Sequence, residues 1–249
     1  MNVLRVEALK LLRSPVGIVA TLAVVAGAMA LLGGIAAAVA GGNPEVAAKA
    51  GPAATPDWDG LLAGASQVTA VGGLIGFGAV LAWMFGREFT DGTITGLFAL
   101  PVGRGRIALA KILVHLAWVA CVGVLLAAGV LGLGLLLGYG TPDAETWAGL
   151  GRQVALALLT GLIVAPVAWI ATAAHSVFAG VGGTVALVIL AQVGALSGAG
   201  GWMPLAAPAL WAMSAGAAVS GVELLLVAAV PVVFGALACV SWSRLQLRR

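Results

Sequence analysis

Four basic side chains gather in the longest polar interruption of an otherwise apolar chain, the stretch from residue 86 to residue 111. They are Arg87, Arg104, Arg106 and Lys111. Clustered Lys and Arg can bind nucleic acid, but they also mark the cytoplasmic ends of membrane spans. Because apolar runs stand on both sides of this segment, the second explanation is favoured, and no nucleic-acid partner is expected.

Residue types that catalyse reactions are present but not in a catalytic arrangement. None of the three lysines follows a glycine, so the chain has no phosphate-binding Gly-Lys loop. His115 and His175 stand alone, and no Cys or His pair has metal-ligand spacing. Ser197-Gly198 lacks the preceding glycine of Gly-x-Ser-Gly and has no His in a later apolar run to act as base. We therefore expect no enzyme activity and no catalytic, cofactor-binding or metal-binding residues.

The composition is that of a membrane protein. The chain has 249 residues, of which 62% are hydrophobic and 8% charged, whereas a soluble domain carries about 25% charged residues. A spanning helix needs roughly 20 apolar residues. Six runs meet this need: residues 16–40, 62–85, 107–139, 153–174, 177–196 and 222–242. The predicted fold class is an all-α polytopic membrane protein with six transmembrane helices in a single domain, residues 1–249, and Pro166 should kink the fourth helix.

Residues 1–15 are predicted to form an interfacial helix before the first span. Leu4, Ala8, Leu11 and Leu12 fall on one helical face, which is typical of a helix lying in the membrane surface. The alternative is a simple cytoplasmic extension of the first span.

Residues 197–220 are too apolar for an ordinary loop, yet Pro204, Pro208 and repeated glycines disfavour a continuous helix. The distribution of charge decides whether this segment crosses the membrane as a seventh span. With six spans, all Lys and Arg except Lys49 and Arg152 fall on one side, and a seventh crossing would place the Arg-rich tail outside. The segment is therefore predicted to be an extracellular re-entrant or interfacial hairpin, and both termini are predicted to be cytoplasmic.

The centres of the six runs contain no Asp, Glu, Lys or Arg. Because charged residues inside spans mark ion pathways, this argues against an ion-coupled carrier and against a voltage sensor. Of the polar residues in the runs, Gln192 is the best candidate for a substrate path, since a lone Gln inside a span needs an interhelical partner. Thr69 and Thr172 are weaker candidates, because a Thr in a span usually bonds to its own helix.

The polar segment itself is predicted to contain a short helix. Asp91 is a suitable N-cap, Ile94, Leu97 and Phe98 share one apolar face, and Pro101 ends the helix. Held between two rigid spans, this helix can transmit a push from a partner protein. The alternative is an ordinary interfacial loop helix with basic anchors.

The run GREFTDGTITGLFALPVGRGRIALAKI resembles the type 2 ABC exporter permeases. In that family an acidic residue ends the second span, followed by Gly-Thr, by Leu-Pro-small-small-Arg and by Ala-Lys entering the third span. The matching positions are Glu88, Gly92-Thr93, residues 100–104 and Ala110-Lys111. Gly103 stands where the family commonly has Ser or Thr. The start LRVEALKLLRSP is similar to the family's N-terminal interfacial helix.

The resemblance implies the membrane-spanning permease subunit of an ATP-driven exporter in the inner (plasma) membrane. It implies two partners besides the lipid bilayer: an ABC ATP-binding subunit, which holds ATP and Mg²⁺, and a second permease subunit, identical or related. The cargo would be a hydrophobic or amphipathic drug, peptide or lipid, moved by alternating access. Residues 87–106 would be the cytoplasmic coupling segment, with the ATPase coupled through Arg87, Glu88, Asp91, Gly92, Thr93, Leu97, Pro101 and Arg104.

Two other functions remain open from the sequence. One is an ion-coupled carrier or channel that works without an ATPase. The other is a membrane scaffold protein that transports nothing and uses the polar segment only to bind a partner.

Overall fold

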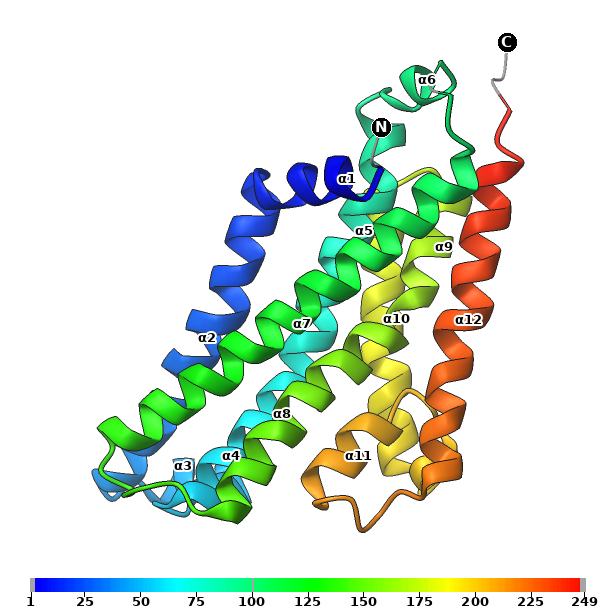
Figure 1. Ribbon diagram of the computed structural model, residues 1–249. Coiled ribbons are helices and arrows are strands. Elements are labelled where there is room, and N and C mark those ends of the chain that lie inside the picture. Colours follow the sequence, from blue (N-terminus) through cyan, green and yellow to red (C-terminus); the bar gives the residue numbers. More distant parts are fainter. Residues whose placement is uncertain (1–2, 100, 247–249) are drawn as a thin grey trace.

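Six long helices run side by side through the computed structural model, which describes residues 3–99 and 101–246 (Figure 1). Each is long and apolar enough to cross a membrane. They are α2 (Pro15–Ala40), the continuous helix of α4 (Trp58–Val68), η2 (Thr69–Gly73) and α5 (Leu74–Thr90), α7 (Arg104–Leu136), α8 (Ala144–Ile163) with α9 (Ala165–Ala173), α10 (Val177–Leu196) and α12 (Gly221–Ser243). The predicted all-α, six-span fold class is confirmed.

Several helices begin earlier than the apolar runs, because polar caps start them. The Asp143 side chain accepts a 2.8 Å hydrogen bond from the backbone N–H of Thr146, so α8 begins at Ala144. The stretch between the third and fourth apolar runs, residues 140–152, is therefore mostly helical. Asp57 likewise caps α4 through the N–H of Gly60 at 2.8 Å. The stretch between the first and second apolar runs, residues 41–61, also contains α3 (Pro44–Ala50), the 3₁₀ turn η1 (Gly51–Ala54) and the first turn of α4.

The fourth span breaks as predicted. Pro166 lacks the N–H that would continue the ladder of helical hydrogen bonds, and the helix is interrupted at Val164, between α8 and α9. A tight turn at His175, whose φ is 51°, then leads into α10, with the Ser176 hydroxyl as N-cap. This helix begins and ends where the sequence predicts.

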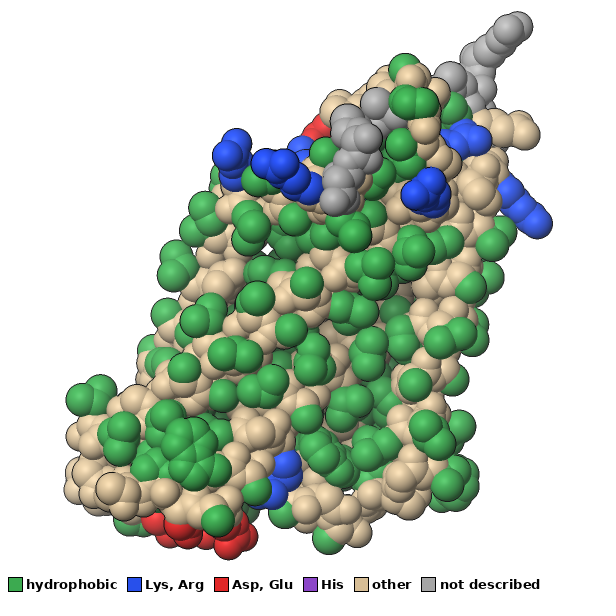
Figure 2. Space-filling model, in the orientation of Figure 1, with side chains coloured by type: hydrophobic (Ala, Val, Ile, Leu, Met, Phe, Trp, Pro, Cys, Tyr) green, Lys and Arg blue, Asp and Glu red, His purple; other side chains and the backbone are tan. Residues whose placement is uncertain are grey.

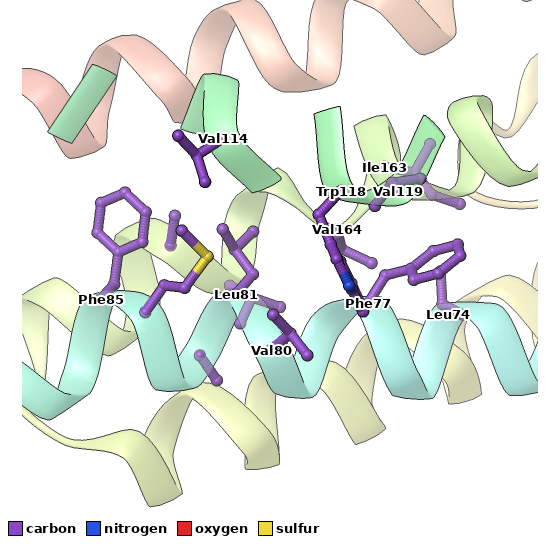
Figure 3. Packing of buried hydrophobic residues seen from close by; sticks show 14 of the residues in the cluster. Leu74, Phe77, Val80, Leu81, Phe85, Val114, Trp118, Val119, Ile163 and Val164 are labelled. Atoms are coloured by element: carbon purple, nitrogen blue, oxygen red, sulfur yellow. The ribbon is translucent and has the colours of Figure 1, made fainter. Parts of the chain in front are cut away.

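The main core lies around α5, between α7, α9, α10 and α12. Figure 3 shows side chains of α5 and α7 meeting in this core together with Ile163 and Val164, and the rings of Phe77 and Trp118 meet edge to face at 5.7 Å. Gly86 lets α5 approach the start of α10, since a Cβ there would lie 2.6 Å from the backbone nitrogen of Val177. The core therefore holds the C-terminal part of α5 close against the start of α10.

The outer surface is mostly apolar and its two ends differ in charge. Figure 2 shows hydrophobic side chains over the middle of the visible face, most basic side chains at the end near α1 and α6, and most acidic ones at the other end. Exposed residues such as Phe178 (87%) and Leu196 (86%) suit a lipid environment. The chain thus has the surface of a multi-pass membrane protein.

Residues 197–220 form two short helices at the acidic end, η3 (Gly200–Trp202) and α11 (Ala207–Met213), which pack against α4, α8 and α12. No helix of spanning length occurs in this described stretch. Its depth relative to a bilayer stays a prediction.

The helix α1 (Val3–Leu12) lies across the basic end at a sharp angle to α2 and packs against α7 (Figure 1). Glu7 and Leu11 are buried, whereas Leu4 is 44% and Leu12 65% exposed. The predicted apolar stripe is therefore divided, and the face that α1 presents to the protein includes a carboxylate. Its position in the membrane interface stays a prediction.

Candidate functional site

The polar segment between α5 and α7 stands at the basic end of the bundle. Here α5 continues to Thr90, and one helical turn, α6 (Ile94–Leu97), follows before α7 starts. The predicted apolar face is confirmed, because Leu97 is buried and Ile94 and Phe98 are partly buried. The predicted N-cap role of Asp91 is wrong. Since α5 runs past its apolar part, Asp91 lies at its C-terminus. Thr93 takes the N-cap position of α6, but its side chain accepts no capping hydrogen bond.

Gly92 and Thr93 connect this segment back to the end of α5. Gly92 has φ of +67°, a left-handed conformation that glycine adopts at low cost and that turns the chain after a helix. The turn lets the Thr93 hydroxyl donate a 2.5 Å hydrogen bond to Oε2 of Glu88. The acidic residue and the Gly-Thr pair therefore act as one local unit.

Glu88 also belongs to a buried cluster of four charges, which joins three helices. Lys111 Nζ of α7 lies 2.8 Å from Glu7 Oε2 of α1 and 3.0 Å from Glu88 Oε1 of α5. Lys10 Nζ lies 2.9 Å from Glu7 Oε1 and 3.0 Å from Glu88 Oε1. We call these four residues the charge cluster.

The charge cluster is neutral as a whole and largely shielded from water. The side chains of Lys111, Glu7 and Glu88 are 1%, 4% and 3% exposed, and that of Lys10 is 31% exposed. Burial acts to lower the pKa of Lys10, but hydrogen bonds and attraction from Glu7 and Glu88 outweigh it and raise the pKa above the usual value. Losing one charge would leave another buried without a partner.

Sequence reasoning missed this cluster. Glu7 drew no attention there, and Lys111 was expected only as a basic residue entering the third span. One signal was available: Glu7 and Leu11 are four residues apart, so both lie on one face of α1, and that face had to meet protein. The second partner of Glu7, Lys111, is 104 residues away, and no local pattern identifies it.

An aromatic group packs beside the charge cluster. Trp242 of α12 is fully buried, meets Phe85 edge to face at 5.7 Å, and its ring centroid lies 5.6 Å from Lys111 Nζ. Its indole N–H donates a 3.0 Å hydrogen bond to Thr172 of α9. The last span is thus tied to the same end of α7.

Arg104 joins the polar segment to the end of α12. Its guanidinium donates hydrogen bonds to the backbone carbonyls of Leu245 and, at 3.2 Å, Ser243, and lies 4.4 Å from the ring centroid of Phe98. A cation at the C-terminus of a helix satisfies its last carbonyl groups and its dipole.

The eight residues predicted to couple to a partner divide by exposure. Asp91, Gly92, Thr93 and Pro101 are exposed, so a partner can touch them. Glu88 and Leu97 are buried, and their part is to hold the segment in place. Arg87 and Arg104 are partly buried. Arg87 lies 4.5 Å from the Trp83 ring centroid and 3.7 Å from Asp91, so it also packs within the segment.

The predicted substrate-path residues do not share one place. Gln192 is exposed and lines a groove of about 340 Å³ with Gln67. Thr69 is buried in the π-helical turn η2, where it accepts a hydrogen bond from Gln153 of α8. Thr172 donates a 2.7 Å hydrogen bond to the carbonyl of Ala168 and lies in the contact with α12. Their role in transport stays a prediction.

Within the described residues, no three His, Cys, Asp or Glu side chains are placed to share a metal ion. The structure therefore directs attention to the polar segment and the charge cluster beneath it.

Comparison with protein families gives one match. The family described as ABC-2 family transporter protein matches residues 3–192, more than half of the chain, including α1, the polar segment and the charge cluster. No curated protein and no solved structure matches the chain.

Proposed function

We propose how this chain works from the premise that it belongs to the ABC-2 family of transporter proteins and is the permease subunit of an ABC transporter. A separate ATP-binding subunit, holding ATP and Mg²⁺, docks on residues 87–106. ATP-driven closure of that partner shifts the permease between two packings of its helices, and so moves a hydrophobic or amphipathic cargo out of the cell.

The observation that carries the proposal is the attachment of the polar segment to the charge cluster. Thr93 bonds to Glu88, and Glu88 and Glu7 share the two lysines. A displacement of the segment therefore acts at once on α5, α7 and α1. An ordinary surface loop without such ties would absorb the displacement in its own backbone.

The face that the segment leaves free suits a docking partner. Residues 91–93, 95 and 96 are exposed, and two of them are glycines. Glycine allows another backbone to approach closely, while Asp91 offers a charge. The apolar side of the same turn, led by Leu97, packs against the main core.

Charge supports an orientation with the α1 and α6 end in the cytoplasm. Most Lys and Arg gather at that end and most Asp and Glu at the other (Figure 2). The ATP-binding subunit then meets the segment from the cytoplasm, both termini are cytoplasmic, and residues 197–220 face outside. A second permease subunit, the same chain or a related one, completes the pathway in the plasma membrane.

The test begins with co-purification of an ABC ATP-binding subunit, followed by its ATPase rate in lipid nanodiscs with and without the chain. We expect the chain to stimulate ATP hydrolysis, and Asp91→Lys to reduce that stimulation with little effect on thermal stability, because Asp91 is exposed. Asp59→Lys, a charge reversal at the opposite end, is the matched control and should leave the stimulated rate unchanged.

Two outcomes contradict the proposal. One is equal stimulation by the wild type and Asp91→Lys. The other is cargo movement by the chain alone in vesicles, driven by an ion gradient, which would identify the ion-coupled carrier instead.

A further inference from the structure

A groove between α2 and the second span extends from the acidic end to the middle of the bundle. Its outer part, about 460 Å³, lies between α2, α3 and α4, and its inner part, about 290 Å³, lies between α2 and α5. Both parts share Leu31, Val68 and Gly72, so they adjoin. Each is close to or within the roughly 300–1,000 Å³ range of small-molecule sites.

The packing of α2 explains why the groove exists. Near the middle, Val24 of α2 closes on Gly76 of α5, where a Cβ would lie 2.5 Å from Val24 Cγ2. The Trp118 indole N–H holds the same part of α2 through a 2.9 Å hydrogen bond to the Thr21 hydroxyl. Toward the acidic end, Leu32 of α2 lies against Gly64 of α4, while Leu31 and Ile35 of α2 face the groove.

The length of the groove matches one leaflet of a membrane. Lining residues on α2 run from position 23 to position 35, which at the rise of an α-helix is about 18 Å. Half of a hydrocarbon core that is roughly 30 Å thick is about 15 Å. An acyl chain entering from the acidic end would therefore reach the inner end of the groove.

Of the described residues that line the groove, Lys49 at its mouth is the one with a charge. Lys49, in the last turn of α3, is exposed, lines the groove and makes no ion pair with any described residue. The other charged residues near it along the chain, Glu45, Asp57 and Asp59, are acidic. An anionic head group at Lys49 would supply the missing partner, while the apolar walls below it hold the chain.

We propose that this groove binds an amphiphile with an anionic head group, its head at Lys49 and its acyl chain along α2 and the second span. That this amphiphile is the transported cargo rests on the function proposed above. The binding itself rests only on the shape and charge of the groove.

The test uses the full chain in nanodiscs of zwitterionic lipid with a trace of a fatty acid that carries a photoreactive diazirine, and the matching fatty alcohol as neutral probe. After illumination, mass spectrometry locates the labelled residues. We expect label on both walls of the groove. Gly72→Leu from one wall and Leu31→Phe from the other should each reduce it, whereas Gly34→Leu, on α2 outside the groove lining, should not.

Charge dependence separates this site from ordinary lipid contact. Lys49→Glu should lower labelling by the fatty acid about three- to fivefold, as expected for loss of a partly exposed ion pair, and leave labelling by the alcohol unchanged. Equal labelling in the wild type, Gly72→Leu and Leu31→Phe would overturn the site. An equal effect of Lys49→Glu on labelling by the fatty acid and by the alcohol would also overturn it. Cross-linking between two copies through Leu31→Cys, with Cys121 and Cys239 replaced by Ala, would show that a second chain covers the groove and would also overturn it.

The two proposals fail separately. If the probes label the groove as expected but the chain does not stimulate ATP hydrolysis by an ATP-binding subunit, the binding site stands and the proposed function is refuted. Stimulated ATP hydrolysis together with labelling that is the same in the wild type and in the groove variants would refute only the binding site.

Discussion

Removing one charge from the buried cluster should destabilise the protein strongly, and removing two opposite charges together should cost less than the sum of the two single removals. In Lys111→Met, Glu7 and Glu88 keep only Lys10, so one negative charge remains without compensation. Breaking a buried ion pair from one side costs about 3–5 kcal/mol. For a chain of this size the midpoint of thermal unfolding should fall by about 10 °C.

The double variant Lys111→Met/Glu88→Gln restores neutrality, because the pair of Lys10 and Glu7, 2.9 Å apart, remains. Its cost should be smaller than the sum of the two single costs by about 2 kcal/mol, within the range for residues in direct contact. The unfolding of the purified chain in mixed micelles, followed by circular dichroism as denaturing detergent increases, gives the free energy of unfolding for each variant.

Arg106→Met is the matched control, since Arg106 lies on the same helix, is exposed and has no ion pair among the described residues. Its effect should stay within about 0.5 kcal/mol. Strictly additive costs for Lys111→Met and Glu88→Gln, or a cost of Lys111→Met no larger than that of the control, would refute the claim that the cluster is a single electrostatic unit.

Three further substitutions test the packing and the polar segment. Gly86→Ala should lower the free energy of unfolding by about 1–3 kcal/mol, because its Cβ would meet the backbone of α10. The control Gly151→Ala, which has open space at the Cβ, should stabilise the helix by up to roughly 1 kcal/mol. Equal effects of the two variants in detergent unfolding would contradict the close approach of α5 and α10. Gln153→Leu should change stability by less than about 1 kcal/mol. The substitution removes the hydrogen bonds of Nε2, but it also removes the buried Oε1, which has no hydrogen-bond partner among the described residues. A loss of several kcal/mol in the same measurement would show that the amide is fully paired. Arg104→Gln should cost under about 1 kcal/mol of stability but reduce stimulated ATP hydrolysis clearly, and unchanged stimulation would remove Arg104 from the coupling residues.

The candidate site was only partly visible in the sequence. The motif around Glu88, Gly92 and Thr93 and the apolar face of α6 could be located, because both depend on residues within a few positions of one another. The N-cap assignment of Asp91 failed for a related reason: hydropathy placed the end of the second span at residue 85, but α5 continues to Thr90. A helix end set by capping and tertiary contacts is shifted by several residues from the end of an apolar run.

The sequence by itself determined the number of spans, the break before Pro166 and the bounds of α10, since these follow from local hydropathy and from the missing N–H of proline. Only the tertiary structure decided which charges share a partner. Glu7 and Lys111 are far apart in the chain, and they pair because α1 folds back over the end of α7. That arrangement depends on the packing of all the long helices, a property that no short stretch of residues contains.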